Sequence, residues 1–280
     1  MENQNPLLAY SRRSQPILNL SSEGNFWPAG SIEKSNNIEV FPLTGQDELL
    51  LLSASSSLVG SILAEIISNC VPSIYDVWSM PRIDLDCIMI AIRCASYNNR
   101  MNIQFQCQKD KCNHTQSQSI DLLEVSQQIR LPKYDLPYSV GNIKLWLKPL
   151  TFHETFQESA DQSTKFSVIQ KLSEEGLSDD EKKKLAVESL SDITKINVRS
   201  MARSIKCISI GEDISVENAE YINEWLSQCD RETFSEIKKA IDECNSEYQL
   251  PQKHFNCEKC NHTNTVDIEF NPADFLKKGD

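Results

Sequence analysis

The sequence predicts an α+β fold with a mostly helical body, short strands, and a split ribbon built from two distant cysteine knuckles. Three observations lead to this prediction. Apolar residues recur at helical spacing in several long windows. Short segments of alternating apolar residues are typical of strands. Two similar Cys/His motifs, one in the middle of the chain and one near its end, are each flanked by strand-like segments.

The two motifs share more than their cysteines. Residues 105–114 read FQCQKDKCNH and residues 255–262 read FNCEKCNH, so Phe precedes and Asn-His follows the cysteines in both. Four thiolates at tetrahedral positions are a preferred ligand set of zinc. We therefore expect residues 101–123 and 252–270 to form a split zinc ribbon around one structural Zn²⁺ ion. Its expected ligands are Cys107, Cys112, Cys257 and Cys260.

Two histidines, His114 and His262, close the motifs and leave alternatives open. Either could replace a cysteine as a ligand or complete a separate site, and the thiols could also carry no metal. We expect both histidines instead to lie beside the ribbon, hydrogen-bonded to a thiolate or to the backbone. A zinc ion with four thiolate ligands has no open position for a water nucleophile. The motifs therefore predict a site that stabilises the fold rather than one that catalyses a reaction.

The amino-acid composition and net charge exclude several classes of function. The 280 residues carry a net charge of −12, with a pI near 4.9 and 8 glycines. An acidic chain without a basic patch is a poor ligand for nucleic acid or anionic membranes. The six other cysteines lie in apolar patterns and the N-terminus is polar, so we expect reduced thiols in a cytoplasm. The sequence contains no motif of a zinc protease, a phosphate-binding loop or a serine hydrolase.

The composition of residues 1–36 predicts a disordered N-terminal arm, because Asn, Ser, Gln and Glu dominate it. Phe26-Trp27-Pro28 is an apolar exception. It is either a stray aromatic pair in a flexible tail, or an anchor that fixes the arm, through Trp27, on a partner or on the body of the protein. Residues 37–280 are expected to form a single globular domain that includes the ribbon.

A strand and a long helix are expected after the arm. Residues 38–43 favour a short strand. Thr44, with Asp47 three positions later, resembles a capping box and begins a helix with apolar positions from 51 to 67. A glutamate and several serines make this window a poor membrane span. Pro72 is expected to end the helix.

The later elements follow from caps and alternation. Asp84 or Asp86 is expected to cap a second helix, and residues 138–147 alternate as a strand. Residues 173–184 are read as a charged corner, and 193–210 as a helix that turns into a strand or hairpin. The other expected helix caps are Thr151 with Glu154, Ser215 and Asp230.

Several short motifs together resemble one family, the baseplate hub assembly proteins of T-even-type contractile-tailed phages. The motifs are Phe41 to Glu48 before a Leu-rich helix, Cys70-Val71-Pro72, Ile83 to Asp86 leading to Ile90 to Arg93, Trp146 to Thr151, and the closing Cys-x2-Cys-x-His. The resemblance covers residues 38–275. It implies a non-enzymatic role in building the baseplate hub, with relatives that act as chaperones for tail components such as the tape-measure protein.

The leading hypothesis is therefore a chaperone-like baseplate hub assembly factor, with no catalytic residue. It would bind hub or tape-measure proteins in the host cell cytoplasm, and it would bind neither nucleic acid nor membranes. One alternative is a structural baseplate subunit retained in the virion tail. A second is a zinc-ribbon nucleic-acid-binding regulator, which the acidic charge disfavours. A metallo-hydrolase would need an open zinc site, which four cysteines do not offer.

Overall fold

The computed structural model describes residues 12–16, 20–33, 38–53, 58–171, 178–211, 214–268, 270 and 275–276. Contacts within the chain group it into two compact units, which are described separately. Residues 1–130 with 249–280 form the ribbon unit, and residues 131–248 form the sheet unit. Both contain helices and short antiparallel sheets, so the predicted α+β class is confirmed. The expected arm over 1–36 and the expected single domain over 37–280 are not tested by this grouping and stay predictions.

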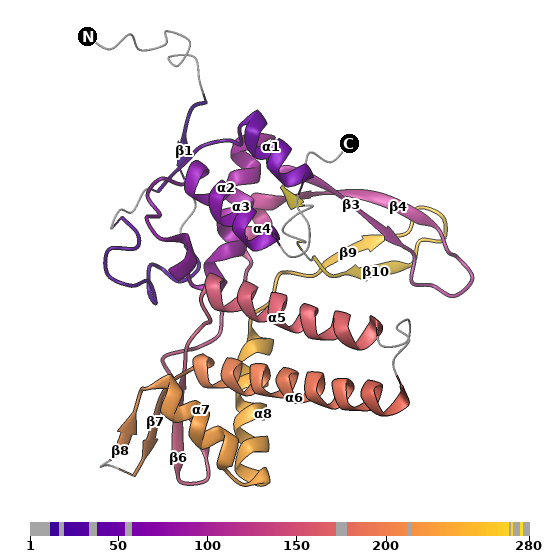
Figure 1. Ribbon diagram of the computed structural model, residues 1–280. Coiled ribbons are helices and arrows are strands. Elements are labelled where there is room, and N and C mark those ends of the chain that lie inside the picture. The colour runs from indigo at the N-terminus through magenta and orange to yellow at the C-terminus, as the bar shows by residue number, and fades with distance from the viewer. Residues whose placement is uncertain are drawn as a thin grey trace. The chain divides into compact units, whose positions relative to one another are not determined.

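In its described residues, the ribbon unit combines helices with three two-stranded antiparallel sheets, which pair β1 with β2, β3 with β4 and β9 with β10. Its elements, shown in Figure 1, are β1 (Gln15–Pro16), β2 (Glu39–Val40), α1 (Gly45–Leu52), α2 (Val59–Cys70), the 3-10 helix η2 (Val77–Ser79), α3 (Arg82–Ser96), β3 (Arg100–Gln106), β4 (Thr115–Asp121), α4 (Leu122–Gln127), β9 (Lys253–Asn256) and β10 (Thr263–Val266). The core centres on α2 and α3, where Leu63, Ile66, Leu85, Ile88 and Met89 are all fully buried.

Two helices, α1 and α2, replace the single helix expected between Thr44 and Pro72. The predicted capping box is present: Thr44 Oγ1 accepts the Asp47 N–H at 3.1 Å, and Asp47 Oδ2 accepts the Thr44 N–H at 2.8 Å. Leu51 and Leu58 lie seven positions apart, close to two helical turns, so apolar spacing alone did not reveal the break between the helices. As predicted, α2 ends just before Pro72.

The expectation that Asp84 or Asp86 caps α3 is wrong. This helix begins after Pro81, so both aspartates lie inside its first turns. Asp84 is buried, and it accepts hydrogen bonds of 2.7 Å from the Ser22 N–H and from Trp27 Nε1. Burial raises the pKa of the Asp84 carboxyl, and the bonds from Ser22 and Trp27 oppose that rise. Trp27 therefore anchors on the body of the protein, as the second interpretation of the aromatic pair proposed.

The end of the chain also returns to α3. Phe275 and Leu276 are buried. The Arg93 guanidinium donates to the Phe275 carbonyl and lies over the Phe275 ring, with Cζ 5.4 Å from the ring centroid. The Tyr97 hydroxyl donates to the Leu276 carbonyl at 3.2 Å. Helix α3 thus contacts Ser22 and Trp27 near the start of the chain and Phe275 near its end.

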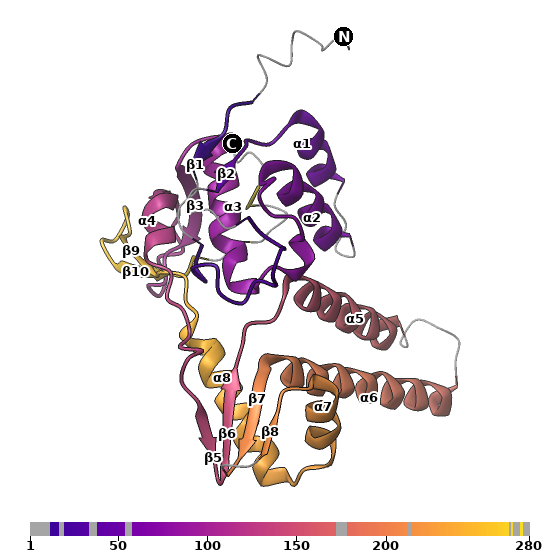
Figure 2. The ribbon, with the colours of Figure 1, turned by 90° about the vertical axis from the view of Figure 1, so that its left-hand side faces the viewer.

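The sheet unit is built on one antiparallel sheet with the strand order β5-β6-β7-β8. Its elements, shown in Figure 2, are β5 (Tyr138–Val140), β6 (Ile143–Leu147), α5 (Phe152–Lys171), α6 (Asp179–Ser204), β7 (Ile205–Ile210), β8 (Ile214–Val216), α7 (Ala219–Gln228) and α8 (Arg231–Glu247). The apolar core joins the sheet to the helices: Leu145 and Ile208 from the sheet pack with Leu226 of α7 and Ile237 of α8.

Three expectations for the sheet unit need correction or limits. Residues 138–147 form a hairpin rather than one strand, because Gly141 takes φ +57° between the paired strands β5 and β6. Asn218, not Ser215, caps α7, and Ser215 lies in β8. The charged corner over 173–184 falls partly on residues 172–177, outside the described residues, and α6 begins after its cap Ser178.

Other expectations for this unit are confirmed. Thr151 and Glu154 exchange cap hydrogen bonds at the start of α5, where the Thr151 N–H donates to Glu154 Oε2 at 2.8 Å. Asp230 caps α8, accepting the N–H of Glu232 and of Thr233 at 3.0 Å. The chain passes from α6 directly into β7 before Gly211, as the mixed pattern of residues 193–210 predicted.

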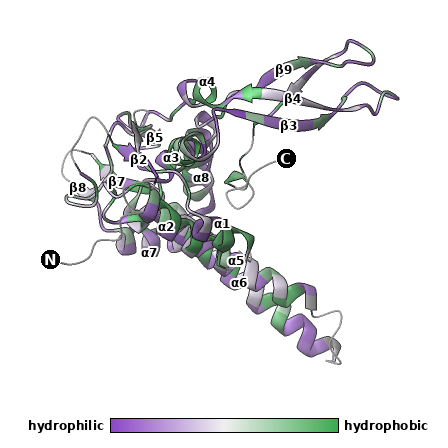
Figure 3. Ribbon diagram, turned by 90° about the horizontal axis from the view of Figure 1, so that it is seen from above, coloured by the Kyte–Doolittle hydropathy of each residue, from purple (hydrophilic) through white to green (hydrophobic). Residues whose placement is uncertain are grey.

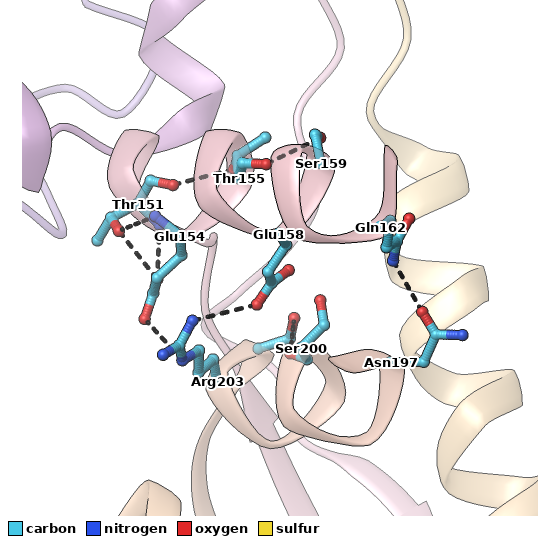
Figure 4. Close-up of polar contacts among 10 residues, drawn as sticks. Thr151, Glu154, Thr155, Glu158, Ser159, Gln162, Asn197, Ser200 and Arg203 are labelled. Carbon is cyan, nitrogen blue, oxygen red and sulfur yellow. Dashed lines mark hydrogen bonds and ion pairs between the residues drawn. The ribbon is translucent and has the colours of Figure 1, made fainter. Parts of the chain in front are cut away.

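Helices α5 and α6 lie side by side, and polar side chains join them (Figure 4). Arg203 of α6 lies 3.3 Å from Glu158 and 3.7 Å from Glu154 of α5. Farther along, Gln162 Nε2 donates to Asn197 Oδ1 at 2.9 Å. Among the helices of the described ranges, none is both long and apolar enough to cross a membrane.

Candidate metal centre

Two β-hairpins present the four predicted cysteines. The strands β3 and β4 pair in register from Arg100 opposite Asp121 to Gln106 opposite Thr115, and their turn carries the first cysteine pair. The strands β9 and β10 pair from Lys253 opposite Val266 to Asn256 opposite Thr263, and their turn carries the second. Figure 1 shows the two hairpins side by side. Segments far apart in the sequence therefore meet at their turns.

The two turns share two features of backbone geometry although one is two residues longer. The Cys107 N–H donates to the His114 carbonyl at 2.8 Å, and the Cys257 N–H donates to the His262 carbonyl at 2.8 Å. The asparagine between the second cysteine and the histidine has a positive φ in both turns, +48° at position 113 and +54° at position 261. Asparagine tolerates this left-handed conformation better than most residues. The repeated asparagine is thus explained by backbone geometry.

The four cysteine sulfurs form one cluster. They all lie within 4.8 Å of one another. Cys107 Sγ is 3.6 Å from Cys260 Sγ, and Cys112 Sγ is 3.8 Å from Cys257 Sγ, so each close pair joins the two hairpins. A tetrahedron with Zn–S bonds of about 2.3 Å has edges of about 3.8 Å. The donor atoms and their spacing therefore fit a four-thiolate metal site.

Among the described residues, three amide side chains clamp the hairpins together by bonding the backbone of the opposite hairpin, and sequence reasoning missed them. Gln108 Nε2 donates to the Thr265 carbonyl at 2.8 Å, and Gln108 Oε1 accepts the Thr265 N–H at 3.1 Å. Gln116 acts likewise in the other direction, with its Nε2 3.1 Å from the Asn256 carbonyl and its Oε1 2.9 Å from the Glu258 amide nitrogen. Each glutamine thus satisfies a backbone donor and a backbone acceptor of the opposite hairpin.

Asn264 completes a near-symmetric arrangement. Its Oδ1 accepts the N–H of Gln108, the residue after Cys107, at 2.7 Å. In the same way, Gln116 Oε1 accepts the N–H of Glu258, the residue after Cys257. Both are buried, Gln116 at 6% exposure and Asn264 at 0%. Both also lie four positions after the second cysteine of their turn. An amide at this shared position was the signal that could have identified the clamp from the sequence.

Aromatic stacking supports the same junction. The Phe105 and Phe255 rings stack with centroids 5.5 Å apart and planes 24° from parallel. These are the two phenylalanines that precede the first cysteine of each motif. Their repetition in the sequence therefore reflects a direct contact between the hairpins.

The backbone of the second turn also favours a thiolate. Desolvation raises the pKa of the Cys257 thiol, but hydrogen bonds from the backbone N–H groups of Cys260 and Lys259, together with those from the Cys107 and Cys260 thiols, outweigh it and lower that pKa to about 6. The turn thus prepares a sulfur that can bind a cation at neutral pH.

The histidines take part in the site through their backbone. Besides the two carbonyl acceptors, the His262 backbone hydrogen-bonds to the Cys260 sulfur. The side chain of His114 is half-buried and that of His262 is exposed. A supporting role for either imidazole, expected from the sequence, stays a prediction.

Comparison with protein families extends these findings to most of the chain. Residues 30–277 match the family described as T4 bacteriophage base plate protein. The chain belongs to this baseplate family. The matched range includes both hairpins and all four cysteines, and it confirms the broad part of the resemblance stated for residues 38–275. No curated protein and no solved structure matches the chain. Membership in the baseplate family does not separate an assembly role from a structural one.

Proposed function

We propose that this baseplate-family protein is a hub assembly factor, a non-enzymatic and chaperone-like protein that binds hub or tape-measure proteins during tail morphogenesis. The observation that carries the proposal is the family match over residues 30–277. In this role the protein acts in the host cell cytoplasm, where tails are assembled. Its net charge of −12 suits partners with basic surfaces.

The proposal includes one structural Zn²⁺ ion held by Cys107, Cys112, Cys257 and Cys260. The sulfur spacing and the all-thiol donor set support zinc, which favours four-coordinate sites of this kind. The bound ion would join two hairpins that the chain places far apart, and its binding free energy would add to the stability of the ribbon unit. Four protein ligands close the coordination sphere, so the ribbon would support binding rather than hydrolysis.

A structural subunit of the baseplate is the second candidate, because the family description fits it equally well. Such a subunit stays in the particle in a fixed copy number, whereas an assembly factor leaves. A nucleic-acid-binding regulator remains the least supported candidate, since the chain is acidic.

The test begins with native mass spectrometry of the purified protein, alone and mixed with the hub and tape-measure proteins of its phage. We expect one zinc per chain and a complex with at least one of those proteins. Quantitative mass spectrometry of purified virions then separates the two baseplate roles. The assembly-factor proposal predicts depletion of this chain from virions relative to hub proteins.

Three outcomes would change the proposal. A fixed stoichiometry in virions would replace the assembly factor by a structural subunit. Retention on DNA that weakens steeply with salt would favour the regulator. A protein purified without zinc, and unable to take it up, would remove the zinc ion and leave only family membership.

A further inference from the structure

Helix α1 and the start of α2 expose leucines to solvent. Leu49 and Leu52, three positions apart on α1, are 69% and 71% exposed, and Leu58 at the start of α2 is 54% exposed. The leucine run of α1 is drawn in green in Figure 3, and only Leu51 of that run is buried. Residues i and i+3 lie on the same face of a helix. We call Leu49, Leu52 and Leu58 the leucine surface.

The stretch of sequence that contains the leucine surface has acidic but no basic side chains. Residues 35–81 contain no Lys, Arg or His, but they include five acids: Glu39, Asp47, Glu48, Glu65 and Asp76. Asp47 is buried in the cap of α1, and the other four are exposed. Glu65 lies seven positions after Leu58, on the same face of α2. Glu48, which precedes Leu49 and accepts a hydrogen bond from the Tyr97 hydroxyl, and Glu65 thus place exposed carboxylates close to the apolar side chains along the chain.

Among the described residues, Arg12 is a cation from outside the segment that lies against it, at the end of α2 and beside the residues that precede α1. Arg12 donates to the carbonyls of Pro42 at 3.0 Å and Asn69 at 2.9 Å, and its Cζ lies 5.5 Å from the Phe41 ring centroid. Asn69 follows Leu58 by eleven positions, which is about 16 Å along a helix axis. The Arg12 guanidinium is thus hydrogen-bonded to backbone carbonyls that lie away from Leu58.

We propose that the leucine surface binds an amphipathic helix of a baseplate partner, with Lys and Arg flanking its apolar stripe. Exposed side chains at helical spacing form ridges that fit the grooves of a second helix. The acidic neighbours select for basic flanks and disfavour acidic ones. The inference rests on the proposed function, because it names the surface and the chemistry through which a tail protein is bound.

The test compares two double variants of the full-length protein in binding to the purified hub and tape-measure proteins. Leu49→Ser with Leu52→Ser removes two exposed apolar side chains, and we expect binding about 30-fold weaker. The matched control is Val187→Ser with Leu190→Ser on α6, where the side chains are 66% and 54% exposed. The control should bind like the parent.

A second pair of variants tests the charge. Glu65→Lys places a cation beside the leucine surface, and we expect weaker binding with a smaller salt dependence. Its control is Glu188→Lys, at an exposed position of α6. A photo-crosslinking residue at position 52 then identifies the contact. The linked partner peptide should carry apolar residues at helical spacing and flanking Lys or Arg.

The outcomes separate this inference from the proposed function. If no tail protein binds the parent chain, both are overturned. If a complex forms and the Leu49→Ser, Leu52→Ser variant binds as tightly as the parent, only the inference is overturned. A crosslink from position 52 to a second copy of this chain, or to an acidic segment, would also overturn it.

Discussion

Two polar junctions among the described residues use different kinds of contact. The ribbon junction, where hairpin β3–β4 meets β9–β10, uses thiols and neutral amides, and its amides at Gln116 and Asn264 are buried. The α5–α6 junction uses charges, with the Arg203 side chain 26% exposed and Lys165 37% exposed. The stability of the ribbon junction should depend on a bound metal ion, whereas the stability of the α5–α6 junction should depend on protonation and on salt concentration.

The largest effect is expected from breaking the ribbon junction. Cys257→Ser removes one ligand, and the remaining thiols should lose the zinc ion. Structural zinc supplies much of the folding free energy of small metal-binding modules. We expect a loss of about 3 kcal/mol or more, with Tm lower by about 10 °C. Zinc analysis, thermal unfolding, and hydrogen exchange at β9 and β10 measure it.

The matched control is Cys229→Ser, which changes a half-buried cysteine of the sheet unit outside the cluster. This variant should keep one zinc per chain and should have a Tm close to that of the parent. A chelator should reproduce the Cys257→Ser effect in the parent. Unchanged melting of Cys257→Ser, or full zinc content, would show that the thiol cluster does not hold the hairpins together.

A smaller, pH-dependent effect is expected at the charged junction. Desolvation raises the pKa of the Glu158 carboxyl, while a hydrogen bond from Ser200 and the charge of Arg203 oppose the rise. Arg203→Ala removes the positive charge that opposes the rise in the pKa of Glu158, and it leaves the buried carboxylate without its cation. We expect the free energy of unfolding near α6 to fall by about 2 kcal/mol at pH 7. Hydrogen exchange of the α6 amides, corrected for intrinsic rates, measures it.

The pH dependence has a defined sign. In Arg203→Ala the folded pKa of Glu158 lies still farther above its unfolded value. Between those two values the folded state binds more protons than the unfolded state, so its stability falls as the pH rises through the folded pKa. The loss of unfolding free energy in Arg203→Ala should be small at a pH below the usual pKa range of glutamate, and it should reach its full size at a pH above the raised pKa of Glu158. Arg199→Ala, at an exposed position one turn earlier, should show neither change.

The ribbon could be predicted because its chemistry fixes both residue type and spacing. Paired cysteines with a shared Asn-His pattern have few structural explanations, and the structure brings all four sulfurs together. The amide clamp was not predicted, because a glutamine in a polar strand is normally solvated. Only the opposite hairpin makes Gln116 a buried partner of backbone groups.

The charged junction and the role of Asp84 were not predictable for the same physical reason. Local sequence places Glu158 and Arg203 on separate helices, and their pairing depends on how α5 and α6 pack. Asp84 resembles a cap because it precedes an apolar stripe, yet its partners Ser22 and Trp27 lie more than fifty positions away. Apolar periodicity and caps report local structure. Polar contacts between distant segments require the fold.

The smallest effect is expected at the outer end of the α5–α6 junction, where Lys165 Nζ lies 2.8 Å from Asp192 Oδ2. Hydrogen bonds from Lys165 and Lys195 lower the pKa of the Asp192 carboxyl. Lys165→Ala should raise that pKa toward its ordinary value and leave Tm unchanged within error, since exposed ion pairs contribute little to stability. Carboxyl carbon chemical shifts followed by NMR across acidic pH measure the change.

Lys195→Ala is the matched control, because Lys195 approaches the other carboxylate oxygen at 3.3 Å and is 70% exposed. It should raise the pKa of Asp192 less than Lys165→Ala does. Added salt should shrink the difference between the variants, because it screens exposed charges. A large fall in Tm for Lys165→Ala would contradict the contrast drawn above, since the outer charged pair would then stabilise the fold as strongly as a buried contact.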